Sequence, residues 1–246
     1  MKSFNILIIL LLICSICFVS CETSDDSEFP QAASLKVVHA INGAPGIYVE
    51  NSMSEDTPFT NLPTLDFSEF RRFTLPARES IDIDVIFETD TTSQVASEQF
   101  NLGAGKIQTY FLYGDEANVS STLVEDIGLR TITDSTNVVR FVNLTKDVNT
   151  FSVDAGGIDN LVSSIEIAEA SEFVTIDATL ENLEYTFSFK DEQGNELSNF
   201  FYRQWFFFPG FGAFVQSFQD TITFALVGAL DDGQGNNTLN VIQIDQ

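Results

Sequence analysis

The single histidine of the chain, His39, is the residue that most readily suggests catalysis, because an imidazole exchanges protons near neutral pH. It lies in the apolar run of residues 35–41, just before the turn signal Asn-Gly-Ala-Pro-Gly of residues 42–46. No serine or cysteine nucleophile motif accompanies it, and the matching position of an internal repeat carries Asn143. Both side chains donate and accept hydrogen bonds, so we expect His39 to hold a turn rather than to catalyse a reaction.

Carboxylates are numerous enough to suggest acid–base or metal sites. Asp82 and Asp84 lie two residues apart in an alternating run, which places both on one face of a strand, as on the solvated side of a sheet. Two turns, residues 191–195 and 231–237, are rich in the oxygen ligands that calcium prefers. Neither turn has the spacing or the terminal Glu of an EF-hand loop, so plain hairpin turns are predicted. We expect no catalytic residue, no metal site and no cofactor.

The most unusual segment is residues 200–218, where more than half of the side chains are aromatic. A strand over residues 200–208 would present aromatic rings on both faces, which a half-exposed strand does not need. Two interpretations stay open: the segment is covered on both sides as core and as interface between two units, or one face meets a partner. The candidate partner-binding residues are Tyr202, Arg203, Trp205, Phe207 and Phe211.

The cysteines of the chain suggest lipid attachment rather than disulfide or zinc chemistry. Lys2 precedes an apolar run over residues 6–13, which has the length of a signal-peptide core and is short for a membrane span. The segment ends in Val19-Ser20-Cys21, which resembles a lipobox, although Phe18 stands where that motif usually has Leu. A plain secretory signal and a permanent transmembrane helix are less favoured, since neither a small-x-small site nor a basic stop-transfer cluster follows. Residues 1–20 are therefore predicted to be a lipoprotein signal peptide, and Cys21 the lipidated residue.

The chain is strongly acidic, with 11 Lys and Arg against 36 Asp and Glu and a net charge of −25. Such a charge repels phosphate backbones, so we expect no nucleic-acid partner. Residues 21–34 begin at the lipidated cysteine and continue as a polar, acidic stretch without periodicity, which is typical of a flexible tether. An acidic run at this position also resembles the export signal that sends some lipoproteins to the outer face of the cell. The membrane is then a partner through Cys21, and the expected location is extracytoplasmic, at the outer membrane or cell surface.

From residue 35 onward, short β runs alternate with turn signals. Residues 81–87 alternate apolar and acidic side chains, which is typical of a strand with one buried face. Residues 107–114 form a second such run, in which alternate side chains share a face. Helical periodicity is weak along the chain, and the expected exception is a helix over residues 159–169.

An internal repeat sets the number of domains. Three segments recur in the same order with slowly drifting offsets: residues 36–50 and 140–154, 81–87 and 183–189, and 109–114 and 223–228. Two tandem units of about 100 residues result, which is a normal size for a β-sandwich.

The predicted fold is therefore all-β, with two tandem antiparallel β-sandwich domains of the immunoglobulin-like or transthyretin-like kind. The first unit covers residues 35–128, a linker covers 129–136, and the second unit covers 137–246. The signal peptide and the acidic tether precede them.

The opening of the first unit resembles a known family. Val37-Val38-His39-Ala40, the following Ala44-Pro45 and the run Ile47-Tyr48-Val49 are similar to the start of the domain of unknown function 4397 family. Phe73-Thr74-Leu75-Pro76-Ala77 resembles its strand and turn. The second unit departs from this pattern, since Asn143 replaces the histidine. The resemblance implies an extracytoplasmic, often tandem β-sandwich on lipoproteins, without an established activity.

Three function classes follow from these observations. The favoured one is a non-enzymatic, lipid-anchored envelope protein that acts as a binding or adhesion module for a glycan or an envelope protein. The second is a structural spacer without a defined ligand. The third, ranked last, is a carboxylate-dependent hydrolase, because the sequence contains no nucleophile elbow or metal-ligand cluster.

Overall fold

The computed structural model describes residues 32–51, 63–76, 80–127, 136–178, 184–203, 205–208, 213–216 and 221–245. Every regular element in these ranges is a β-strand. The same residues contain no helix long and apolar enough to cross a membrane. Ala32–Gln246 forms one compact unit, which is the part described below.

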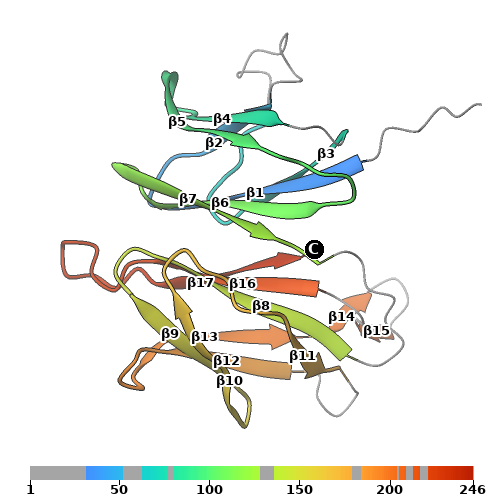
Figure 1. Ribbon diagram of the computed structural model, residues 1–246. Coiled ribbons are helices and arrows are strands. Elements are labelled where there is room, and N and C mark those ends of the chain that lie inside the picture. The colour runs from blue at the N-terminus through green and yellow to red at the C-terminus, as the bar shows by residue number, and fades with distance from the viewer. Residues whose placement is uncertain are drawn as a thin grey trace, which may run out of the picture. The chain divides into compact units, whose positions relative to one another are not determined.

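Seven strands in the first half of this unit build two facing sheets (Figure 1). The strands are Ala32–Asn42 (β1), Ile47–Asn51 (β2), Phe70–Pro76 (β3), Ile81–Phe87 (β4), Asp90–Phe100 (β5), Ile107–Asp115 (β6) and Asn118–Glu125 (β7). One sheet has the order β3-β1-β6-β7 and the other β2-β4-β5. The alternating run of β4 buries Ile81, Ile83 and Val85 between them, as the sequence predicts.

The second half builds a second sandwich. Its strands are Thr136–Thr145 (β8), Thr150–Ala155 (β9), Ile158–Glu166 (β10), Val174–Asp177 (β11), Glu184–Lys190 (β12), Glu196–Arg203 (β13), Trp205–Phe208 (β14), Ala213–Gln216 (β15), Thr221–Gly228 (β16) and Asn240–Asp245 (β17). The sheets are β11-β8-β16-β17 and β10-β9-β12-β13, while β14 and β15 form a two-stranded sheet of their own. Aromatic rings dominate this core, with the Phe187 and Phe224 centroids 4.9 Å apart.

The two halves repeat the same topology, because β3-β1-β6-β7 corresponds strand by strand to β11-β8-β16-β17. The predicted all-β fold with two sandwiches is therefore confirmed. One finer feature differs from the expectation of purely antiparallel sheets. The first strand of each half pairs in parallel with a later one, β1 with β6 and β8 with β16. Residues 129–135 of the predicted linker lie outside the described residues.

The four parallel-paired strands are apolar on both faces because each separates two cores. In β1, Leu35 and Val37 point into the first sandwich, whereas Val38 and Ala40 point to the other side. The same alternation in β6, β8 and β16 produces a third core between the sandwiches, built from Val38, Ala40, Phe111, Tyr113, Val142, Leu144, Ala225, Val227, Ile242 and Ile244. Four sheets are thus stacked, as Figure 1 shows, with β3-β1-β6-β7 and β11-β8-β16-β17 in the middle.

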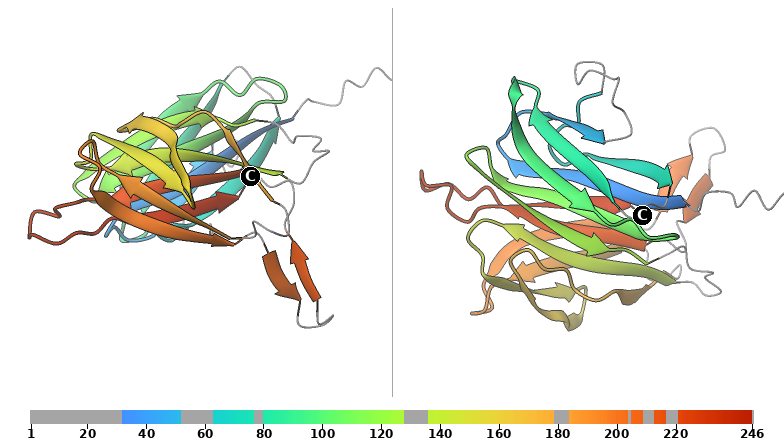
Figure 2. Two further views of the ribbon diagram at one scale, coloured as in Figure 1. Left: turned by 90° about the horizontal axis from the view of Figure 1, so that it is seen from below. Right: turned by 45° about the horizontal axis from the view of Figure 1, so that its top comes forward.

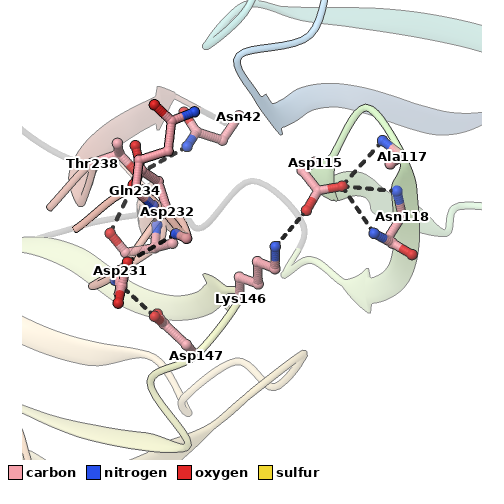
Figure 3. Close-up of polar contacts among 12 residues, drawn as sticks. Asn42, Asp115, Ala117, Asn118, Lys146, Asp147, Asp231, Asp232, Gln234 and Thr238 are labelled. Atoms are coloured by element: carbon pink, nitrogen blue, oxygen red, sulfur yellow. Dashed lines mark hydrogen bonds and ion pairs between the residues drawn. The ribbon is translucent and has the colours of Figure 1, made fainter. Parts of the chain in front are cut away.

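Polar contacts across this interface are reciprocal. Asn42 at the end of β1 donates to Thr238 Oγ1 ahead of β17 at 2.9 Å. Lys146, which follows β8 at the matching position, donates to Asp115 at the start of the β6–β7 turn at 2.6 Å (Figure 3). The ends of β1 and β8 thus each contact the other half, through acceptors at different positions of the β16–β17 and β6–β7 connections. The interface has the arrangement of an isologous dimer within one chain.

A buried ion pair follows the same pattern. Arg140 of β8 lies against Asp126 after β7, and their side chains are 1% and 0% exposed. The Arg140 guanidinium also donates to the Glu125 carbonyl at 3.0 Å and to Thr223 Oγ1 at 2.9 Å. At the matching position of β1, Lys36 donates to the Asp245 carbonyl at the end of β17 at 2.6 Å. Each half therefore places one buried cation on the last strand of the other.

The helix expected over residues 159–169 is wrong. These residues belong largely to β10, which pairs with β9 in an antiparallel ladder interrupted by two register shifts. Each irregularity changes which side faces inward, so Leu161, Val162 and Ile165 all pack on the core. Their spacing imitates a helical period, which explains the error.

Candidate functional site

His39 holds a turn, as the sequence predicts. Its ring is fully buried, and Nδ1 accepts the amide hydrogen of Ile41 at 3.3 Å. This assigns the proton to Nε2, which donates to the Pro45 carbonyl at 3.0 Å. Burial lowers the pKa of His39, so the neutral form is favoured.

Asn143 makes the equivalent contacts in the second half. Its Nδ2 donates to the Val148 carbonyl at 3.0 Å, and its Oδ1 accepts the amide of Thr145 at 3.2 Å. An amide thus replaces an imidazole at the same turn, because each offers one donor and one acceptor. The role of this position is structural.

The two acidic turns are hairpin loops of one design. Asp191 accepts the amides of Gln193 and Asn195 at 2.9 and 2.8 Å, and the Asn195 side chain donates to it at 2.8 Å. Asp232 is bonded in the same way to Gln234 and to the backbone and side chain of Asn236. The side-chain amide of the turn's own Asn holds the pKa of Asp191 below its ordinary value. Both carboxylates are therefore used by their turns, and no cluster that could hold a metal ion occurs among the described residues.

The aromatic segment divides between core and surface. Tyr202 is only 4% exposed, and its ring lies 5.4 Å from that of Phe224 in the second core. The expectation that Tyr202 contacts a partner is thus corrected, because its position on β13 faces inward. Phe201 and Arg203, on the other face of β13, are exposed, and Phe201 retains 49% of its accessible surface.

The remaining candidates lie in or next to a separate hairpin. Trp205 and Phe207 belong to β14, where they pair with Gln216 and Phe214 of β15. The hairpin stands away from the stacked sheets in Figure 2. Phe211 lies outside the described residues.

The outward face of the sheet β10-β9-β12-β13 is polar. Alternation buries Phe151 and Val153 of β9 and turns Ser152 and Asp154 outward. The strand pairing lines up outward residues of three strands, placing Asp154 opposite Ser188 and Ser188 opposite Asn199.

At the outer edge of this face, the Arg203 guanidinium lies 5.0 Å from the centroid of the Phe201 ring. Arg203 also forms an ion pair with Glu184 of β12 at 3.2 Å. The pair fixes the guanidinium over the ring, and Phe201 faces solvent beside it. An aromatic face and a charged group are thus displayed together on an edge strand.

A groove of about 520 Å³ opens on the same face, between β9, β10, the end of β12 and the turn that follows it. An ion pair between Asp154 and Lys190 crosses it. Lys190 is the main cause that lowers the pKa of Asp154, and Asp154 in turn raises the pKa of Lys190. The Asn160 amide donates to Asp154 at 2.8 Å, which ties β10 to β9 at this point.

A known family matches the part of the chain that contains the first sandwich. The model of a family described as "Domain of unknown function (DUF4397)" matches residues 33–155. The chain belongs to this family. The match runs from β1 through β9, so it covers the first sandwich and the first two strands of the second. No curated protein matches the chain.

The groove of this DUF4397 protein is not visible in the sequence alone. The alternation in Thr150–Ala155 and Glu184–Lys190 was available as a signal, and it indicates one polar face for each strand. The juxtaposition of Asp154 with Lys190 depends on which strands are neighbours. Pairing partners are not visible in the pattern of a single strand.

Proposed function

We propose that this DUF4397 protein is a non-enzymatic, lipid-anchored protein of the cell envelope that acts as a binding or adhesion module for a glycan or protein partner. Cys21 holds it at the outer membrane or cell surface, and residues 22–31 serve as the tether, which is shorter than the predicted 21–34 because Ala32, Ala33 and Ser34 belong to β1. The proposal is supported by the lipobox-like sequence before Cys21 and by the strongly acidic composition.

One structural observation carries the binding role: the exposed Phe201 ring with Arg203 beside it on the edge strand β13. A half-exposed phenylalanine on a polar sheet face offers a flat apolar surface on which a sugar ring or a partner side chain stacks. The hairpin of β14 and β15, whose sequence includes Trp205 and Phe207, follows β13 in the chain.

The anchor is tested by metabolic labelling with a clickable fatty acid. We expect the label on the native protein and on a Cys17→Ser control, because Cys17 belongs to the segment that is removed. Cys21→Ser is expected to lose the label. Equal labelling of both variants would show that Cys21 is not the lipidated residue.

The binding surface is tested with isolated cell envelopes and the purified full chain. Phe201→Ala and Arg203→Gln are expected to weaken envelope binding roughly tenfold each, as for anchor residues at an interface centre. Ile158→Ala is the matched control, since Ile158 is 47% exposed on the opposite edge strand of the same sheet. A loss that is the same in all three variants, or absent in all three, contradicts a role for this surface.

A second candidate function is that of a rigid spacer without a ligand. The observation in its favour is the continuous third core between the sandwiches, with the buried pair Arg140–Asp126 beside it. Such an interface resists bending between the two halves. A spacer would function through its length and rigidity, so substitutions of exposed side chains should not change envelope binding. The Phe201 and Arg203 variants therefore distinguish the two functions.

A further inference from the structure

We propose that the groove on the outer face of the second sandwich is a carbohydrate subsite that accepts a sugar unit without negative charge. The inference rests on the proposed function, since it names a ligand class for an extracytoplasmic binding module. The groove has a volume of about 520 Å³, within the range of roughly 300–1,000 Å³ that holds small ligands.

The walls of the groove are held in place by contacts of their own. Asp154 is fixed by Lys190 and by the Asn160 amide. On the opposite side, Thr150 Oγ1 donates to Glu192 at 2.8 Å, which ties β9 to the β12–β13 turn. A ligand would therefore not need to order Asp154 or Glu192.

Several polar side chains facing the groove make no hydrogen bond within the described residues. These are the carboxylate of Asp159, the side-chain amide of Asn160 and the hydroxyls of Ser152, Ser163 and Ser164. Each hydroxyl both donates and accepts, the amide does the same through two different atoms, and the carboxylate accepts only. This mixture matches the hydroxyl groups of a sugar, which need donors and acceptors at close spacing.

The charge of the lining restricts the ligand further. Asp154, Asp159, Asp191 and Glu192 face the groove with Lys190 as its one cation. Lys190 is already paired with Asp154, so an anionic ligand meets uncompensated negative charge. Neutral and amine-bearing sugars fit this field, whereas uronic acids and sugar phosphates are repelled.

The first sandwich supplies a matched control. A groove of about 520 Å³ lies there between the β4–β5 and β6–β7 turns and includes Gln94. Its carboxylate Asp90 is used by its own turn, accepting the amide of Thr92 at 3.0 Å and its hydroxyl at 2.7 Å. The two grooves have equal size, so a variant of Gln94 tests whether sugar binding depends on the groove of the second sandwich.

The test is titration calorimetry on the full chain, purified in a detergent without a sugar head group. The probes are methyl galactoside, galactosamine and galacturonic acid. We expect saturable millimolar binding of the first two and at least tenfold weaker binding of galacturonic acid. Asn160→Gly and Ser163→Ala together are expected to weaken binding about tenfold. Glycine suits this site because Asn160 has a positive φ of 52°.

Gln94→Ala is expected to leave sugar binding unchanged, and thermal unfolding of every variant checks that it is folded. The inference is overturned if no probe binds saturably up to 50 mM, if galacturonic acid binds as well as the neutral sugar, or if Gln94→Ala has the same effect as the groove variants. If the sugar test fails but envelope binding still depends on Phe201, only the sugar subsite is wrong and the proposed binding function is retained. If the chain binds the sugar probes but does not bind isolated envelopes, only the proposed envelope role is wrong.

Discussion

Breaking the ion pair between Arg140 and Asp126 should destabilise the whole molecule. In Asp126→Asn the guanidinium of Arg140 stays buried and charged but loses its carboxylate. Its remaining acceptors are neutral: the Glu125 carbonyl, the Thr223 hydroxyl and the amide oxygen of the new side chain. Removing one partner of a buried pair typically costs about 3–5 kcal/mol. Domains of this kind have a total stability of roughly 5–15 kcal/mol, so the loss is a large share.

The assay is urea unfolding followed by far-ultraviolet circular dichroism. The control is Lys106→Gln, which breaks the exposed pair Lys106–Glu125 and should cost at most about 1 kcal/mol. The double variant Asp126→Leu/Arg140→Met removes both charges and should recover part of the loss, because the buried Thr109 hydroxyl and the Glu125 carbonyl still lose their partners. A loss below about 1 kcal/mol in Asp126→Asn would refute the reasoning, because it would mean that water reaches the pair.

Three further predictions follow from buried and tightly packed positions. Burial lowers the pKa of Lys36 to about 8 from 10.5, so the unfolded chain binds more protons between these values and stability rises with pH there. Relative to Lys36→Met, the native chain should gain roughly 2–3 kcal/mol from pH 7 to pH 10, measured by urea unfolding; a constant difference contradicts this. The pKa of His39 is lowered in the folded chain, so the free energy of unfolding falls as the pH drops below the ordinary histidine pKa. His39→Asn should make the free energy of unfolding depend less on pH in this range, as measured by chemical unfolding at pH 5 and pH 7. Gly114→Ala should cost at least about 1 kcal/mol and lower the melting temperature, because φ is 102° and the new Cβ would lie 2.3 Å from the Asn118 carbonyl oxygen; Gly43→Ala, which meets no atom within 4 Å, is the control and should lose less.

The fold was predictable where local patterns decide it. The repeat, the alternation in residues 81–87 and the turn chemistry around His39 and Asn143 all act within a few residues. The apolar residues of β1 and β8 lie at consecutive as well as alternate positions, which is typical of strands covered on both faces. These features identified two sandwiches correctly.

The features that the sequence does not predict depend on contacts between residues that are far apart in the chain. The contacts of Lys36 and Arg140 are not visible locally, because their acceptors lie on the last strand of the other half or just after it. The outward turn of Phe201 and the inward turn of Tyr202 likewise depend on which face of β13 meets the core. The groove needed the neighbourhood of β9 and β12, which lie about thirty residues apart in the chain.

The reciprocal interface also bears on how the two halves can differ. In a symmetric dimer of identical subunits, every substitution appears twice, so a change that improves one site alters its copy as well. Here the covalent link keeps each half at a high effective concentration for the other, and association does not depend on dilution. Each half can then change independently. Lys36 and Arg140, which occupy corresponding positions of the repeat, are an example. The binding face proposed for β13 of the second half therefore needs no copy on the first half, and the proposal predicts one binding site per chain.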